Sequence, residues 1–166
     1  MRRFGRVKEM GNSRLDTIRS AIENYLGLLD GKPKTEQHEL KALTVALDRL
    51  VAEYQRGEDV DVADEEADPP ETDYQSLYQR ADASFPTLGY YTHIAPDEDV
   101  SAKPGLADAI DDLADMARDL SDVIWHLDQG RAANAIWHFR FTYEVHWGVH
   151  LQGLRGYLHS TTIAAW

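Results

Sequence analysis

The fold is decided by LADAIDDLADMARDLSDVIWHLD at residues 106–128 and by AANAIWHFRFTYEVHWGVHLQGLRGYL at residues 132–158. In the first stretch, apolar residues recur every three or four positions, which is the period of an amphipathic helix. This core stripe consists of Leu106, Ile110, Leu113, Ala117, Leu120, Ile124 and Leu127. In the second stretch, apolar residues lie almost all round, which is typical of a helix surrounded by other helices. Gly130 separates the two, so we expect one helix over about 104–128 and another over 132–158.

Three further helices are expected earlier in the chain. Apolar residues at helical spacing predict one helix over about 14–29 and a second over about 36–56. A third, over about 73–84, ends before Pro86, because proline disfavours helical backbone at the residue that precedes it. No long stretch has the alternating pattern of a strand. The sequence therefore predicts an all-α fold, a single-domain helical bundle of about five helices over residues 1–166.

The composition fits a globular domain and excludes several kinds of chemistry. The chain has 166 residues, long enough to bury a core, and its lack of cysteine excludes disulfides, thiolate nucleophiles and cysteine-based metal sites. Seventeen basic and 29 acidic residues give a formal net charge of −12, which disfavours nucleic acid and anionic membranes as partners. No apolar run approaches the ~20 residues of a membrane span, and no signal peptide is evident. We therefore expect a cytoplasmic bacterial protein.

Two segments fall outside the helical pattern. Residues 1–12 form a basic N-terminal tail, which polar residues follow. Residues 58–73 carry nine carboxylates, no basic residue and the pair Pro69-Pro70, so we expect an acidic mobile loop there. Such charge runs are usually solvated, with loose cation binding or contact with a basic partner as the alternatives.

Six aspartates lie opposite the core stripe of the helix expected over 104–128 and define an acidic face. They are Asp108, Asp111, Asp112, Asp115, Asp119 and Asp122. Like charges at this spacing repel one another and lower helix stability. The face is either a solvated outer surface of the bundle or a docking surface for a basic protein partner.

The pair His146 and His150 is the main candidate for metal chemistry. Histidines four residues apart lie on one helical face, which is the spacing a metal site requires. His126 or a carboxylate of another helix would complete the site. The residues between the pair are Trp, Gly and Val, so the sequence lacks the His-Glu-x-x-His pattern of metalloproteases. The alternative is that both histidines are structural, with no cofactor bound.

Charged and aromatic residues supply two further candidate groups. One sector of the last helix holds Arg140, Glu144, Arg155, Trp137 and Trp147. This sector is either a solvated stripe or contains a buried ion pair between Arg140 and Glu144. Tyr90 and Tyr91 lie in a loop that is too apolar to extend into solvent, so they and the tryptophans are candidates for a small-molecule pocket.

Several short motifs follow one another along the second half of the chain. They are Tyr78-Gln79-Arg80, Phe85-Pro86-Thr87-Leu88-Gly89-Tyr90-Tyr91, Leu113-Ala114-Asp115-Met116-Ala117-Arg118-Asp119-Leu120, Leu127-Asp128-Gln129-Gly130, Ala135-Ile136-Trp137-His138-Phe139-Arg140-Phe141, His146-Trp147-Gly148 and Leu154-Arg155. Together they resemble the bacterial DUF5063 family of uncharacterised proteins, and the likeness covers roughly 74–159. The resemblance implies a small helical domain without assigned catalytic residues. It further implies that Trp147-Gly148 and Leu154-Arg155, rather than both histidines, form the centre of the family pattern, which favours a packing role.

These observations favour a non-catalytic interaction protein, which would form a homo-oligomer or meet a basic partner through its acidic surface. The alternative is a metal-binding protein, or a metal-dependent hydrolase, that uses His146 and His150. A small-molecule pocket is the third hypothesis.

Overall fold

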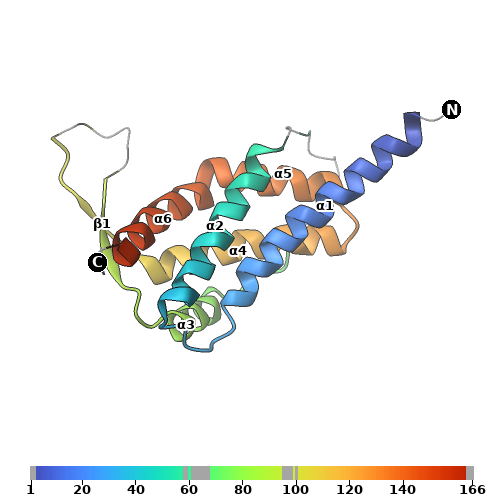
Figure 1. The fold of residues 1–166 in the computed structure, drawn as a ribbon. Coiled ribbons are helices and arrows are strands. Elements are labelled where there is room, and N and C mark those ends of the chain that lie inside the picture. The colour runs from blue at the N-terminus through green and yellow to red at the C-terminus, as the bar shows by residue number, and fades with distance from the viewer. Residues whose placement is uncertain (1–2, 58–59, 61–67, 95–98, 100, 164–166) are drawn as a thin grey trace.

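Helices dominate the computed structural model, which describes residues 3–57, 60, 68–94, 99 and 101–163 (Figure 1). In chain order the elements are α1 (Arg3–Leu28), α2 (Gln37–Gln55), α3 (Tyr74–Ser84), β1 (Tyr90–His93), β2 (Gly105–Asp108), α4 (Ala109–Asp128), α5 (Ala132–Thr142), the π-helical turn η1 (Tyr143–Trp147) and α6 (Gly148–Ile163). Within the described residues, β1 and β2 form the only sheet. The predicted all-α, single-domain bundle of about five helices is confirmed.

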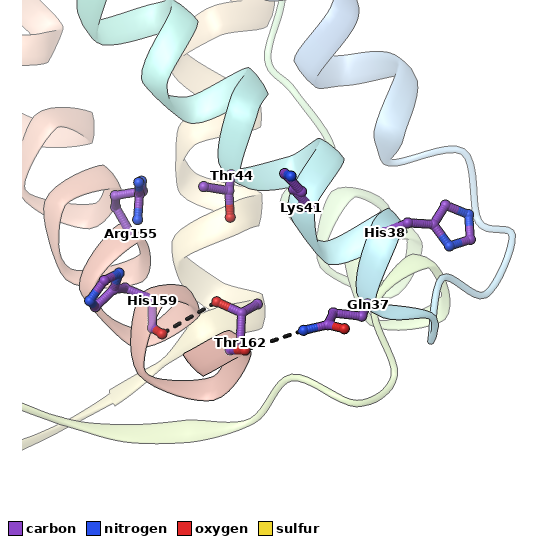
Figure 2. A pocket seen from close by; sticks show the side chains of 7 residues that line it. All are labelled: Gln37, His38, Lys41, Thr44, Arg155, His159 and Thr162. Carbon is purple, nitrogen blue, oxygen red and sulfur yellow. Dashed lines mark hydrogen bonds between the residues drawn. The ribbon is translucent and has the colours of Figure 1, made fainter. Parts of the chain in front are cut away.

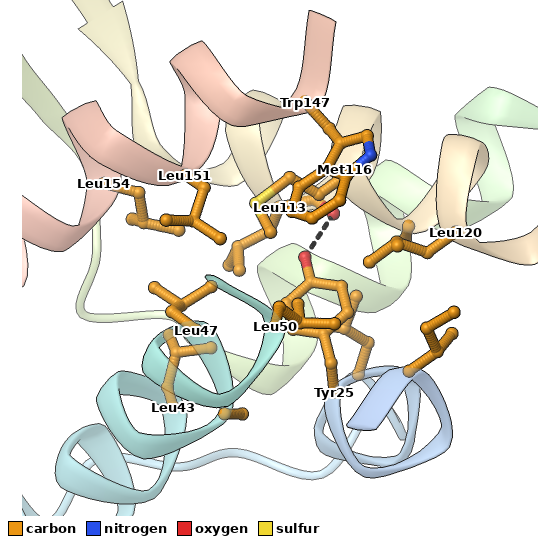
Figure 3. Packing of buried hydrophobic residues seen from close by; sticks show 14 of the residues in the cluster. Tyr25, Leu43, Leu47, Leu50, Leu113, Met116, Leu120, Trp147, Leu151 and Leu154 are labelled. Atoms are coloured by element: carbon orange, nitrogen blue, oxygen red, sulfur yellow. Dashed lines mark hydrogen bonds between the residues drawn. The ribbon is translucent and has the colours of Figure 1, made fainter. Parts of the chain in front are cut away.

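The core lies where α1, α2, α4 and the η1–α6 segment converge (Figure 3). Leu47 of α2, Leu113 of α4 and Trp147 of η1 are fully buried there. Tyr25 of α1 is also buried, and its hydroxyl donates to the backbone carbonyl of Leu113 at 2.8 Å, which gives this buried polar group a partner. Burial of each large apolar side chain contributes roughly 1.5–3 kcal/mol, so this convergence holds α4 firmly against η1 and α6.

The helix predicted over 104–128 begins later than expected, because β2 precedes it and pairs antiparallel with β1. Asp108 is the N-cap of α4, and its carboxylate accepts the backbone N–H of Ile110 at 2.9 Å. Leu106 lies on the strand and is 75% exposed, so its assignment to the core stripe is wrong. A four-residue strand that pairs with a distant segment is too short to show a local period.

The helix predicted over 132–158 is divided into α5 and α6 by η1. Phe139 and Trp147 are eight residues apart, which corresponds to about 80° in a continuous α-helix. The additional residue of a π-turn reduces this angle to about 20°, so both side chains enter the core, with ring centroids 5.3 Å apart. A Cβ atom at Gly148 would lie 2.3 Å from the backbone oxygen of Tyr143, so the turn requires glycine at this position.

The two segments predicted to be non-helical have different outcomes. α1 begins at Arg3, earlier than the helix start expected near residue 14, and so includes most of the segment predicted as a basic tail at 1–12. The acidic loop predicted at 58–73 lies largely outside the described residues, and its last residue, Asp73, is the N-cap of α3. None of the described helices is both long enough and apolar enough to cross a membrane.

Candidate metal centre

The acidic face of α4 lies against neighbouring elements of the same chain. It comprises Asp108, Asp111, Asp112, Asp115, Asp119 and Asp122. Asp112 and Asp119 are buried and the other four are half-buried, so the prediction of a solvated outer face is wrong. The helical pattern shows only that this face avoids the apolar core. It does not show that histidine and tyrosine side chains of other elements cover the face. Tyr78 of α3, for example, donates from its hydroxyl to Asp108 at 3.0 Å.

The two candidate histidines are held by two of these aspartates. Nδ1 of His146 lies 2.7 Å from Oδ2 of Asp119, and Nδ1 of His150 lies 2.8 Å from Oδ1 of Asp112. A carboxylate oxygen accepts, so in each ring Nδ1 carries the proton and donates it. In the neutral ring Nε2 then keeps its lone pair. Metal-ligating histidines are usually oriented in this way, by a carboxylate on the other ring nitrogen.

Asp115 brings a third ligand to the same point. It lies between Asp112 and Asp119 on α4, and ligand atoms of Asp115, His146 and His150 all lie within 4.8 Å of one another. Nε2 of His150 is 3.6 Å from Oδ2 of Asp115. Two ligands that share a zinc ion at about 2.1 Å lie roughly 3–4 Å apart. The separation of His150 and Asp115 is in that range, and the other separations within the set reach at most 4.8 Å.

Neighbouring residues fix this arrangement from two sides. Nη2 of Arg118 donates to Oδ1 of Asp115 at 3.0 Å, which places one positive charge beside the carboxylates. On the other side, the hydroxyl of Tyr91, on β1, donates to Oδ2 of Asp112 at 2.6 Å. A Cβ atom at Gly153 would lie 2.4 Å from that hydroxyl, so glycine at this position allows the hairpin to reach the site. The hairpin thus positions His150 through Asp112.

Burial and charge shift the pKa values of these groups. Burial raises the pKa of Asp115, and the nearby His150 opposes this effect. The hydrogen bond to Asp112 raises the pKa of His150, against the effect of burial. Burial and then the same carboxylate raise the pKa of Tyr91, so its hydroxyl keeps the proton that it donates. The carboxylates of Asp112, Asp115 and Asp119 lie close together beside the guanidinium of Arg118. A bound cation would offset the repulsion between these carboxylates.

His126, which was predicted to complete the histidine pair, lies elsewhere in the structure. It is buried two helical turns beyond Asp119, with its ring 5.6 Å from that of His138. Burial lowers the pKa of both histidines. It also raises the pKa of Asp122, which is 3.7 Å from Nε2 of His138, to about 6, with the Asp119 charge adding to the effect. Asp115, and not His126, is the third candidate ligand beside the histidine pair. In the sequence, its place on the same helical face as Asp112 and Asp119 was the signal that could have identified it.

The charged sector of the last helix meets α2 at Tyr54. Nη1 of Arg140 donates to the backbone carbonyl of Tyr54 at 2.8 Å, and the Tyr54 hydroxyl donates to Glu144 at 2.9 Å. Glu144 is exposed, so the alternative of a fully buried ion pair is wrong. Arg155, in contrast, donates from Nε to Asp48 of α2 at 2.7 Å.

The aromatic residues do not form the predicted pocket together. Trp147 is buried, and its Nε1 donates to Oγ1 of Thr142 at 3.0 Å. Trp137 stacks on Phe141 with centroids 4.7 Å apart, and Tyr90 is 68% exposed. A hollow of about 540 Å³ is lined by Tyr91 and other residues of β1 and α6, without Tyr90 or a tryptophan.

Comparisons with known proteins agree with this fold. The crystal structure of protein BF1032 from Bacteroides fragilis is similar, with a TM-score of 0.71 over 89% of this chain and 91% of that one. The two sequences are 14% identical, so the likeness concerns the fold alone. No curated protein matches the chain. The model of the DUF5063 family, described as a domain of unknown function, matches residues 12–164, and the chain therefore belongs to that family.

Proposed function

We propose that this protein binds one divalent transition-metal ion through Asp115, His146 and His150. The observation that carries the proposal is the convergence of three ligand atoms whose two imidazoles are both oriented by buried carboxylates. One such contact is common between helices. Two parallel contacts, from Asp112 and Asp119, with a third carboxylate between them, form a complete set of inner ligands and outer partners.

The ligand set indicates which ions and reactions fit. Two imidazole nitrogens and one carboxylate suit zinc, iron(II) or manganese(II) and leave open coordination positions. The ligands are half-buried, so water can reach them. A metal held in this way would act as a Lewis acid and lower the pKa of a bound water to about 7. The chain's contribution is to fix the imidazole tautomers and to hold Asp115 beside Arg118. Metal-dependent hydrolysis is the reaction that this set would support.

The test is the metal content of untagged protein, purified without chelator and measured by elemental analysis. We expect close to one metal ion per chain in the wild type and a loss in His146→Ala/His150→Ala and in Asp115→Asn. His38→Ala is the matched control, because it removes an exposed histidine outside the site. Wild-type protein that neither contains metal nor takes up added zinc, iron(II) or manganese(II) would contradict the proposal. Unchanged content in both site variants would do the same.

The interaction role expected from the composition stays a prediction. The net charge of −12 is compatible with a basic partner. However, the aspartates of α4 contact histidines and tyrosines of the same chain, so they offer a smaller surface to a partner than the sequence implied. Neutralising Asp111 and Asp115 in a pulldown tests this role, and unchanged capture would remove these aspartates from it.

A further inference from the structure

A separate hollow lies between α2 and α6 (Figure 2). Its volume is about 440 Å³, within the range of sites for small molecules. The lining side chains are Gln37, His38, Lys41, Thr44, Arg155, His159 and Thr162. His146 and His150 instead face the aspartates of α4. The hollow is therefore independent of the proposed metal centre.

The lining of this hollow is basic although the chain as a whole is acidic. Lys41 and Arg155 are positively charged, His38 and His159 add two imidazoles, and none of the seven side chains is acidic, in a chain with 29 acidic and 17 basic residues. Figure 2 shows Arg155 and His159 on α6 across from Thr44 on α2, whereas His38 points away. Within the described part of the chain, no carboxylate forms an ion pair with Lys41. The surface charge therefore favours an anion at this place.

Arg155 is fixed in position but retains free donors. Its Nε and Nη2 donate to the two oxygens of Asp48 at 2.7 and 3.2 Å, which occupies one edge of the guanidinium. A guanidinium has five N–H donors, so Nη1 stays available to a ligand. A planar group held in this way loses little freedom on binding a phosphate or carboxylate.

The rest of the lining offers acceptors. The Thr44 hydroxyl donates to the Leu40 carbonyl at 3.2 Å and the Thr162 hydroxyl to the Leu158 carbonyl at 2.8 Å. The hydrogens are thus used within the helices, and the Oγ1 lone pairs are free to accept. Gln37 donates from Nε2 to the Thr162 carbonyl at 3.3 Å, which leaves its amide oxygen to accept as well. The hollow therefore suits a molecule with an anionic group and several hydroxyl donors.

We propose that this hollow binds a small phosphate ester that carries hydroxyl groups, such as a sugar phosphate. Lys41, Arg155 and His159 surround the phosphate, and the hydroxyls donate to Thr44 and Thr162. A lysine and an arginine together are the usual charged partners of phosphate, the lysine as a point charge and the arginine through its planar fork. The volume exceeds the need of inorganic phosphate, which is why the ester is assigned.

The test is calorimetric titration of the full chain with ribose 5-phosphate, ribose and inorganic phosphate, with EDTA present to keep the metal centre empty. We expect saturable binding of ribose 5-phosphate and weaker binding of the other two. Lys41→Gln should weaken it by roughly tenfold or more, because a charge-assisted contact is lost. Lys103→Gln is the matched control, since this lysine is exposed and lies outside the hollow, and it should bind as the wild type does.

Three results would overturn the proposal. They are absence of saturable binding of ribose 5-phosphate, equal binding by Lys41→Gln and wild type, and binding of inorganic phosphate as tight as that of the ester. Lys41 is exposed, so the variant should keep its fold, and a melting curve checks this. Because EDTA is present, none of these results depends on whether the metal proposal holds.

Discussion

Replacing Gly153 by alanine should weaken metal binding although Gly153 is not a ligand. The added Cβ would lie 2.4 Å from the hydroxyl oxygen of Tyr91. Nonbonded carbon contacts lie near ~3.5 Å, so the Tyr91 ring must move by about 1 Å. Its 2.6 Å hydrogen bond to Asp112 does not survive a displacement of that size. Asp112 then loses the contact that holds its carboxylate in place, while its other oxygen still accepts from His150.

The expected magnitudes follow from these contacts. Loss of a hydrogen bond to a charged group costs roughly 1.5–3 kcal/mol, and loss of an outer partner lowers metal affinity by roughly 10–100-fold. Alanine is a better helix former than glycine and offsets about 1 kcal/mol. We therefore expect Gly153→Ala to bind zinc at least tenfold more weakly, and to lower the unfolding free energy of the metal-free protein by about 1 kcal/mol.

The assay is competition for zinc with a chromogenic chelator, together with urea unfolding of metal-free protein. Gly156→Ala is the matched control on the same helix, because a Cβ there meets no atom within 4 Å. It should keep the wild-type affinity and gain about 0.5–1 kcal/mol of stability. Tyr91→Phe removes the hydroxyl without a clash and should reproduce the loss of affinity. If Gly153→Ala matches Gly156→Ala in both measurements, the proposed link from the hairpin to His150 is wrong.

Three further changes test other parts of the structure. Gly148→Ala places a Cβ 2.3 Å from the Tyr143 carbonyl, so urea unfolding should show a loss of at least about 1 kcal/mol rather than the gain typical of Gly→Ala in a helix. The pKa of Asp122 is raised to about 6, so its charge destabilises the fold most above pH 6 and the penalty disappears as the pH falls toward 4. Thermal melts should therefore show Asp122→Asn more stable than wild type at pH 7.5, with a smaller difference at pH 4.5, and a constant difference would contradict this. Arg118→Gln should lower the melting temperature of the metal-free protein more than that of the zinc-loaded protein, because either positive charge offsets the repulsion around Asp115; equal losses would count against that reasoning.

The sequence predicted the helices well because apolar periodicity is a local property. The stripe with Leu113 and Leu120 enters the core as expected. The β1–β2 hairpin was missed because its strands are four residues long and depend on pairing between distant segments. The last helix is divided at Gly148, where η1 ends and α6 begins. A π-turn inserts one extra residue so that particular side chains reach the core. Apolar periodicity alone does not show where such an insertion occurs.

The candidate site was half predictable. The spacing of His146 and His150 placed both on one face, and that expectation agrees with their meeting at Asp115. The acidic face was misinterpreted because a polar stripe was equated with exposure to solvent. An antiparallel arrangement of α4 and the η1–α6 segment sets Asp119 opposite His146 and Asp112 opposite His150. These pairings depend on how the two helices pack, whereas helical wheels consider one helix at a time.

A crystal grown with zinc and measured at the zinc absorption edge would show whether Asp115, His146 and His150 hold a metal ion. We expect one strong anomalous peak between Asp115, His146 and His150, with each ligand atom about 2.0–2.2 Å from it. The contacts from Asp112 and Asp119 to the opposite ring nitrogens should be retained. A peak beside His126 and His138 instead, or no ordered zinc near Asp115, would contradict the account.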